Sequence, residues 1–239
     1  MLNKPTIRIS LFLIVVITAL VAHAGFYSSE VVSQKIRHDG FWHIHETLVP
    51  IDEGTFDFRD LFTMRSSNDQ AFPVYRLTLI ANAKWFSLDF RVESVIGFLF
   101  SLLLAAFFWR YAFTKLNTPK TWAGAIAVFC IMLVVFSFNS VTRFNWPLVA
   151  YLAFPLFCNV VLMAIYEQSW VNKDTNKAAW LGIAAIATLF ISDAMGMVTI
   201  LALLMVSGIL LFLDRERKAR VWLMATLGVS MIIFVLLRG

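Results

Sequence analysis

The stretch AMGMVTILALLMVSGILLFL, Ala194–Leu213, decides the fold class because it runs for 20 residues without a charged side chain. A helix of about 20 apolar residues spans the hydrocarbon core of a bilayer. Other apolar runs of spanning or near-spanning length recur along the 239-residue chain, which is 60% hydrophobic and only 15% charged. Backbone polar groups in lipid must be paired within helices. The sequence therefore predicts an all-α polytopic membrane protein forming a single integral membrane domain over residues 1–239.

The apolar runs predict about seven transmembrane helices, with spans near residues 94–109, 121–138, 147–166, 178–191, 194–213 and 221–237. The remaining run, residues 10–24, has two interpretations. It is either a retained first helix or a signal that is cleaved after Ala22-His23-Ala24. Most lysines and arginines outside residues 25–93 fall on one side if the N-terminus is cytoplasmic. This bias predicts a periplasmic location for residues 25–93 in a bacterial inner membrane, followed by a six-helix bundle over residues 94–239.

The long external loop, residues 25–93, carries ten of the fifteen acidic residues. Two of its segments have helical patterns. One covers residues 28–40, where Ser29 is expected to cap the helix and Gly40 to end it. The other covers residues 74–86 and follows Pro73. We expect this second helix to lie in the membrane interface, with Arg76 and Lys84 reaching headgroups beside an apolar stripe of Val74, Leu77, Ile80 and Ala81.

The predicted topology brings three polar segments, residues 60–76, 136–147 and 190–197, to the outer face. A carboxylate there suits a general base that acts on a sugar hydroxyl. Arginines bind phosphate through paired, charge-assisted hydrogen bonds. These chemistries give Asp69 as the first catalytic candidate, followed by Asp60 and Glu46. The candidates for substrate binding are Arg65, Arg76, Arg143, Trp146 and Asp193.

Each candidate also has a simpler interpretation. Asn68-Asp69 suits a turn, and Asp193 suits a helix N-cap. Arg65 and Arg76 suit headgroup anchors, while Trp146 suits the interfacial aromatic belt. A loose group of His38, His43, His45 and Glu46 lacks the spacing of a defined metal site, so we expect neither metal nor cofactor. The net charge of +5 is explained by bases that set membrane orientation, and no nucleic-acid partner is expected.

Four stretches occur in an order that resembles a group of bacterial membrane proteins related to GT-C glycosyltransferases. They read DEGTFDFRDLF (52–62), SSNDQAFPVYRL (66–77), FSFNSVTRFNW (136–146) and SDAMG (192–196). The corresponding patterns in the group are an acidic stretch with D-L-F, then N-E-H-R with F-P, then F-S-x-x-Q-W-E-N-x-x-W, and S-x-A-N-G. The resemblance covers about residues 52–213 and implies a seven-helix module with a catalytic acid in the first external loop.

The resemblance implies transfer of a sugar from a polyprenyl phosphate to a glycan or lipid acceptor in cell-envelope glycan assembly. The N-E-H-R core is incomplete, because only Asn68-Asp69 matches its first pair. The Q-W-E-N acid is replaced along residues 140–143, and a single span follows the SDAMG stretch. These departures favour an alternative, a non-catalytic membrane scaffold or assembly partner with the same fold, which would bind another membrane protein. A transporter is disfavoured because Asn159 is the main polar residue inside the apolar runs.

Overall fold

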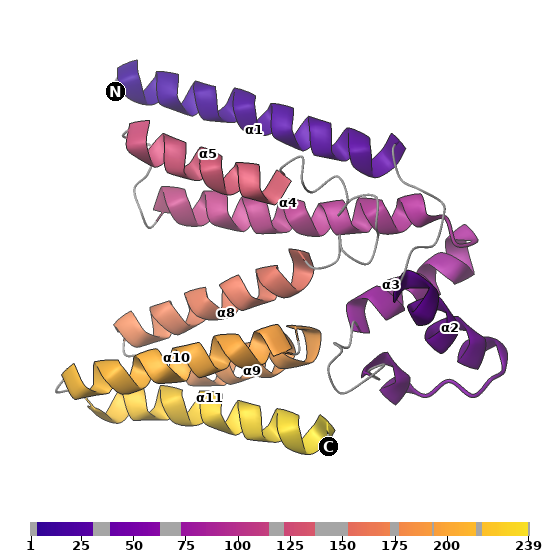
Figure 1. Cartoon of the computed structure of the whole chain (residues 1–239). Helices are drawn as coiled ribbons and strands as arrows, with labels where there is room; N and C mark the ends of the chain where they lie inside the picture. The colour runs from indigo at the N-terminus through magenta and orange to yellow at the C-terminus, as the bar shows by residue number, and fades with distance from the viewer. Residues whose placement is uncertain are drawn as a thin grey trace. The chain divides into compact units, whose positions relative to one another are not determined.

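The computed structural model describes residues 4–30, 39–62, 73–114, 122–136, 153–172, 177–192, 194–213 and 217–238. Apart from short turns, these residues are helical, and the described ranges contain no strand (Figure 1). The prediction of an all-α chain is therefore confirmed. The elements are α1 (Lys4–Glu30), α2 (Asp39–Asp52), the 3-10 helix η1 (Phe58–Phe62), α3 (Pro73–Phe86), α4 (Phe90–Thr114), α5 (Trp122–Phe136), α8 (Ala153–Asn172), α9 (Ala178–Ser192), α10 (Ala194–Leu213) and α11 (Arg217–Arg238).

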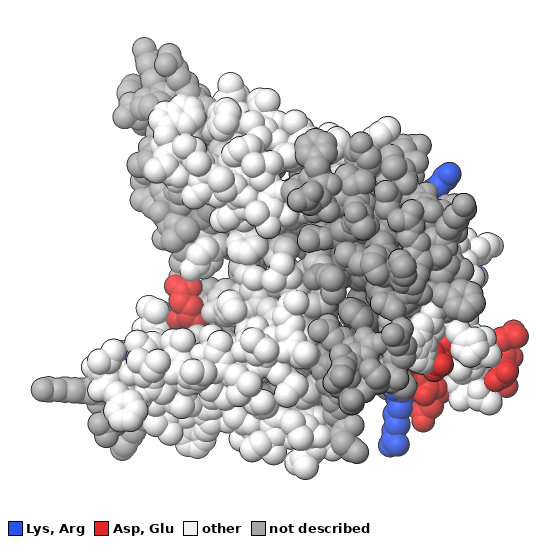
Figure 2. Space-filling model, viewed as in Figure 1, with Lys and Arg blue, Asp and Glu red and all other residues white. Residues whose placement is uncertain are grey.

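Three of the described helices are long and apolar enough to cross a membrane: Ile9–Phe26 in α1, Phe90–Tyr111 in α4 and Ala194–Leu213 in α10. Shorter apolar stretches occupy α5, α9 and residues 220–236 of α11. On the face drawn in Figure 2, the described surface over α10 and α11 is almost entirely uncharged. Large apolar side chains of α10 such as Met205, Ile209 and Phe212 are exposed. A surface of this kind suits contact with lipid tails.

The helices divide into two compact units, and α3 contributes to both, with the division between Leu77 and Thr78. The first unit comprises the described residues of Met1–Thr55 and Thr78–Phe154. In it, α1 packs against α4 and α5, and α4 packs against α5. The aromatic ring of Phe12 on α1 makes edge contacts with the rings of Trp122 and Phe129 on α5, at centroid distances of 5.9 and 6.5 Å.

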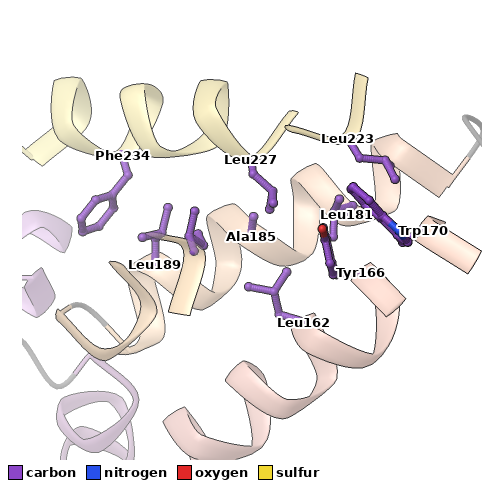
Figure 3. Packing of buried hydrophobic residues seen from close by; sticks show 10 residues of the cluster. Leu162, Tyr166, Trp170, Leu181, Ala185, Leu189, Leu223, Leu227 and Phe234 are labelled. Atoms are coloured by element: carbon purple, nitrogen blue, oxygen red, sulfur yellow. The ribbon is translucent and has the colours of Figure 1, made fainter. Parts of the chain in front are cut away.

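The second unit comprises the described residues of Phe56–Leu77 and Pro155–Gly239. Its core lies where α9 faces α8 and α11 (Figure 3). The core residues of each helix are spaced four or seven positions apart, as expected for one buried stripe on each helix. They include Leu162, Tyr166 and Trp170 of α8, Leu181, Ala185 and Leu189 of α9, and Leu223, Leu227 and Phe234 of α11.

The contact between α9 and α10 depends on a glycine. A Cβ atom placed on Gly196 would lie 2.9 Å from the backbone oxygen of Thr188 and 3.2 Å from the Cα of Leu189. Both neighbours are backbone atoms, so a side chain at this position would force the two helices apart. Gly196 therefore allows α10 to turn back closely along α9 after the short connection that follows Ser192.

The predicted helix boundaries are correct in some regions and wrong in others. The helix expected over residues 74–86 is present as Pro73–Phe86, with proline at its first position, where no backbone N–H is needed. The prediction of a helix over residues 28–40 was wrong about both of its ends. Ser29 lies within α1 instead of capping a new helix, and Gly40 lies in the first turn of α2. The packing of α1 against α4 continues through Gly25, beside the ring of Phe98, and carries the helix past its apolar run.

Candidate functional site

Two of the predicted site residues, Asp60 and Arg76, are in direct contact in the second unit. A guanidinium nitrogen of Arg76, Nη1, donates a hydrogen bond to the backbone carbonyl of Asp60. Arg76 is only 1% exposed and is the largest fully buried side chain among the described residues. Leu61, beside Asp60 in η1, is equally buried. The contact therefore joins the 3-10 turn to the first turn of α3 and holds a cationic side chain inside the protein.

The carboxylate of Asp60 has a local structural role. Its Oδ2 accepts a hydrogen bond of 2.7 Å from the backbone N–H of Asp57. In turn, Oδ1 of Asp57 accepts a hydrogen bond of 3.2 Å from the backbone N–H of Arg59. Side chains of this type commonly satisfy backbone donors at turns and helix starts. The Asp60 side chain therefore stabilises η1, and this interaction reduces its suitability as a general base.

An aromatic chain connects η1 to the end of α9. The ring of Phe62 lies 5.5 Å from the ring of Phe190, which lies 5.2 Å from the ring of Phe234 on α11. The planes of both pairs are steeply inclined, which is the edge-to-face arrangement that aromatic rings prefer. The second unit thus brings the start of the predicted segment 60–76 beside the start of the predicted segment 190–197.

Polar side chains lie between α8 and α9 at the same end of α9. The hydroxyl of Ser192 and the amide nitrogen of Asn159 both donate to the carbonyl of Pro155, at 3.2 and 2.8 Å. One turn earlier in α9, the hydroxyl of Thr188 donates to the carbonyl of Cys158 at 3.4 Å. Asn159 and Thr188 are each 2% exposed, and Ser192 is 4% exposed. The Ser192 and Thr188 bonds join α9 to α8, and hydrogen bonds between helices hold them together where the surroundings are apolar.

The other predicted residues are separate from this cluster or undescribed. Glu46 belongs to α2 in the first unit, where its carboxylate lies 3.7 Å from Nδ1 of His45 in a largely exposed pair. Such pairs contribute little to stability. Within the described ranges, no three His, Cys, Asp or Glu side chains form a group that could hold a metal ion. Asp69, Arg65, Arg143, Trp146, Asp193 and His38 lie outside the described residues.

The faces of α3 differ from the expected ones. Its buried face carries Tyr75, Arg76, Leu79 and Asn82, so Arg76 does not have the exposed position of a headgroup anchor. Leu77, Lys84 and Trp85 lie on the exposed face. The Lys84 ammonium lies 6.0 Å from the centre of the Trp85 ring. An exposed cation beside an exposed indole is typical of a helix at a membrane interface.

The sequence interpretation missed a buried polar pair in the first unit, Asn82 and Glu93. The amide nitrogen of Asn82 donates to Oε1 of Glu93 at 2.9 Å and to the backbone carbonyl of Asp89 at 3.0 Å. Asn82 is 1% exposed and Glu93 is fully buried. The only sequence signal was an acid at the start of an apolar span, a position where ionisable residues are costly and commonly functional.

We compared the chain with protein-family models, with curated proteins and with solved structures, and none of the three comparisons gave a match.

Proposed function

We propose that the chain is an integral membrane protein of cell-envelope glycan assembly that transfers a sugar from a polyprenyl phosphate to a glycan or lipid acceptor. In this proposal about seven helices cross a bacterial inner membrane, the N-terminus is cytoplasmic, and the segment from α2 to α3 is periplasmic. The fold is that of a compact relative of the GT-C glycosyltransferases.

The observation that carries the proposal is the buried Arg76 beside the aromatic end of an apolar helical unit. Its bond to the Asp60 carbonyl fixes the direction of the guanidinium. A planar guanidinium held in this way suits the phosphate of a lipid, and the neighbouring apolar helices suit the prenyl chain. Arg65 and Arg143 are further candidates for binding the same phosphate.

The proposed reaction is a displacement at the anomeric carbon of the donor sugar. Asp69 takes the proton of an acceptor hydroxyl as the new glycosidic C–O bond forms. The bond between the anomeric carbon and the phosphate oxygen breaks, and the polyprenyl phosphate leaves with the electron pair. Arg76 stabilises the charge that develops on the leaving phosphate.

The test uses the full chain in lipid nanodiscs, supplied with polyprenyl-phosphate hexoses and an envelope-glycan acceptor extracted from a strain lacking the gene. Mass spectrometry should detect an acceptor that gains one hexose, and Asp69→Asn should abolish this gain. A wild-type chain that binds the donor without forming product would contradict the enzymatic proposal.

The orientation can be tested separately in a chain whose two cysteines, Cys130 and Cys158, are replaced by serine. A cysteine introduced at the exposed Asp57 should react with a membrane-impermeant maleimide added to intact spheroplasts. Reaction only after the membrane is broken would reverse the proposed orientation.

A second candidate function is a non-catalytic scaffold with the same lipid-binding unit. One observation favours it: of the three candidate acids, Asp60 is bonded to the backbone of Asp57 and Glu46 is paired with His45. Asp69 is then the remaining candidate among these acids. Donor binding without turnover, together with co-purification of a membrane glycosyltransferase, would support this function over catalysis.

A further inference from the structure

One buried acceptor atom in the second unit is not used by the contacts described above. Asn159 is 2% exposed, and its amide nitrogen donates to the Pro155 carbonyl one turn earlier in α8. Its side-chain carbonyl oxygen, Oδ1, is also buried, yet it accepts no hydrogen bond from any side chain or backbone group that the structure describes. Leaving such an oxygen unpaired costs about 1–3 kcal/mol.

The neighbouring hydroxyl groups do not donate a hydrogen bond to the Asn159 oxygen. The hydroxyls of Ser192 and Thr188 direct their protons to the carbonyls of Pro155 and Cys158. Each bond joins α9 to α8, so the protons of both hydroxyls are already used in bonds between the helices. The Asn159 oxygen therefore needs an O–H or N–H donor from a ligand or from water.

The position of Asn159 relates it to the Asp60–Arg76 segment. Asn159 lies one helical turn after Pro155 in α8. The carbonyl of Pro155 also accepts a hydrogen bond from Ser192, the last residue of α9. Phe190, two residues before Ser192, contacts Phe62 of η1. The unpaired oxygen thus lies one turn of α8 from the carbonyl that Ser192 binds, at the end of α9 whose Phe190 contacts η1.

From this placement we infer that Oδ1 of Asn159 accepts a hydrogen bond from a hydroxyl of the sugar in a polyprenyl-phosphate sugar. Asn159 would then distinguish the sugar-bearing lipid from the bare lipid phosphate. This inference rests on the proposed function for the class of ligand. A site that hydrogen-bonds a substrate hydroxyl discriminates strongly against ligands that lack it, because its polar group is then left unpaired.

The experiment measures binding, which does not require turnover. The full chain in nanodiscs is titrated with polyprenyl phosphate and with its glucosyl, galactosyl and mannosyl forms. The wild type should bind one sugar-bearing form more tightly than the bare phosphate. Asn159→Ala should reduce that preference about five- to tenfold, as expected for one hydrogen bond, while the Kd for bare polyprenyl phosphate stays the same.

Thr188→Val is the matched control, because it removes a neighbouring bond between α8 and α9 and keeps the Asn159 oxygen. It should lower the melting temperature and retain the sugar preference. If Asn159→Ala does not fold, Asn159→Asp is used instead. It keeps an acceptor oxygen and should retain the preference for the sugar-bearing lipid.

The outcomes separate the two proposals. If the wild type binds all four lipids equally, the inference about Asn159 fails and lipid-phosphate binding stands. Equal losses of affinity for the bare and the sugar-bearing lipids in Asn159→Ala would also overturn the inference about Asn159, because the residue would then act through structure alone. If the wild type binds none of the lipids, the proposed function and this inference fail together.

Discussion

The side chains of Asn82 and Glu93 meet across 2.9 Å in the interior of the first unit, on two different helices. The same Asn82 nitrogen donates to the Asp89 carbonyl, and the backbone N–H of Leu88 approaches the Asn82 carbonyl at 3.4 Å. Between them, Ser87 and Leu88 adopt left-handed backbone angles, with φ of 54° and 62°. Non-glycine residues with such angles need support from their surroundings. The bonds of Asn82 provide that support and fix the turn from α3 into α4.

Replacing Asn82 by leucine should destabilise the protein. The variant removes the donor to Glu93 and to the Asp89 carbonyl, and we expect a loss of about 2–4 kcal/mol in the free energy of unfolding. The loss should appear as a lower melting temperature in detergent micelles. Adding Glu93→Gln to this variant should recover part of the stability, because a neutral amide is cheaper to bury than a carboxylate. Lys84→Ala, on the exposed face of the same helix, should change stability by less than about 0.5 kcal/mol.

Two glycines of α10 provide a matched pair. Gly196→Ala should cost about 1–3 kcal/mol, since the new methyl group would meet backbone atoms of Thr188 and Leu189. Gly208→Ala should be neutral or stabilising, because a Cβ there meets nothing within 4 Å and alanine favours helix. Thermal unfolding of both variants measures the difference. Equal melting temperatures would mean that α9 and α10 do not depend on this close approach.

Arg76→Met should lower both stability and lipid-phosphate affinity. The side chain retains much of its apolar bulk but loses the donor to the Asp60 carbonyl and the charge proposed to bind phosphate. We expect the Kd for polyprenyl phosphate to rise at least tenfold in nanodiscs. Arg59→Met, at an exposed position in η1, is the control and should leave the Kd within about twofold. An unchanged Kd in Arg76→Met would remove the residue from the proposed phosphate site.

The buried contact between Tyr166 on α8 and Ser207 on α10 suits a double-mutant cycle. Their hydroxyl oxygens are hydrogen-bonded in the second unit. Tyr166→Phe and Ser207→Ala should each reduce the free energy of unfolding by about 1 kcal/mol, and the double variant should lose less than the sum. Strictly additive losses in chemical unfolding would show that the two hydroxyls do not stabilise each other.

Helices with long apolar runs could be predicted because a continuous run of apolar residues is itself visible in the sequence. Ala194–Leu213 is observed at the predicted bounds, and Pro73 marks the start of α3. The faces of α3 could not be predicted in the same way. An apolar-stripe argument assumes that polar side chains are exposed, whereas Arg76 and Asn82 are buried with partners that are distant in sequence, at Asp60 and Glu93. Tertiary hydrogen bonds of this kind leave little signal in a single sequence.

For the candidate site, the placement of segments could be predicted better than the chemical roles of single residues. Of the three segments expected on one face, those at Asp60 and Phe190 meet through the rings of Phe62 and Phe190. Residues 137–147 of the third segment lie outside the described residues, and the common outer face stays a prediction. The chemical roles were harder to assign. Asp60 looked like a catalytic acid by residue type, but its carboxylate binds the backbone of Asp57. Glu93 looked like a loop acid because it ends a polar stretch, although it lies in the first turn of α4 and is fully buried.

If α4 crosses the membrane as proposed, the fixed turn between α3 and α4 would make the protein responsive to bilayer thickness. The apolar part of α4, Phe90–Tyr111, has 22 residues and is about 33 Å long, close to the hydrocarbon thickness of a typical bilayer. If α4 crosses the membrane as proposed, a thinner bilayer would make it tilt. The bonds of Asn82 would carry that tilt into the adjoining residues of α3, from Thr78 onward, and change the depth of Trp85. Short-chain and long-chain lipids would therefore set this part of α3 at different angles.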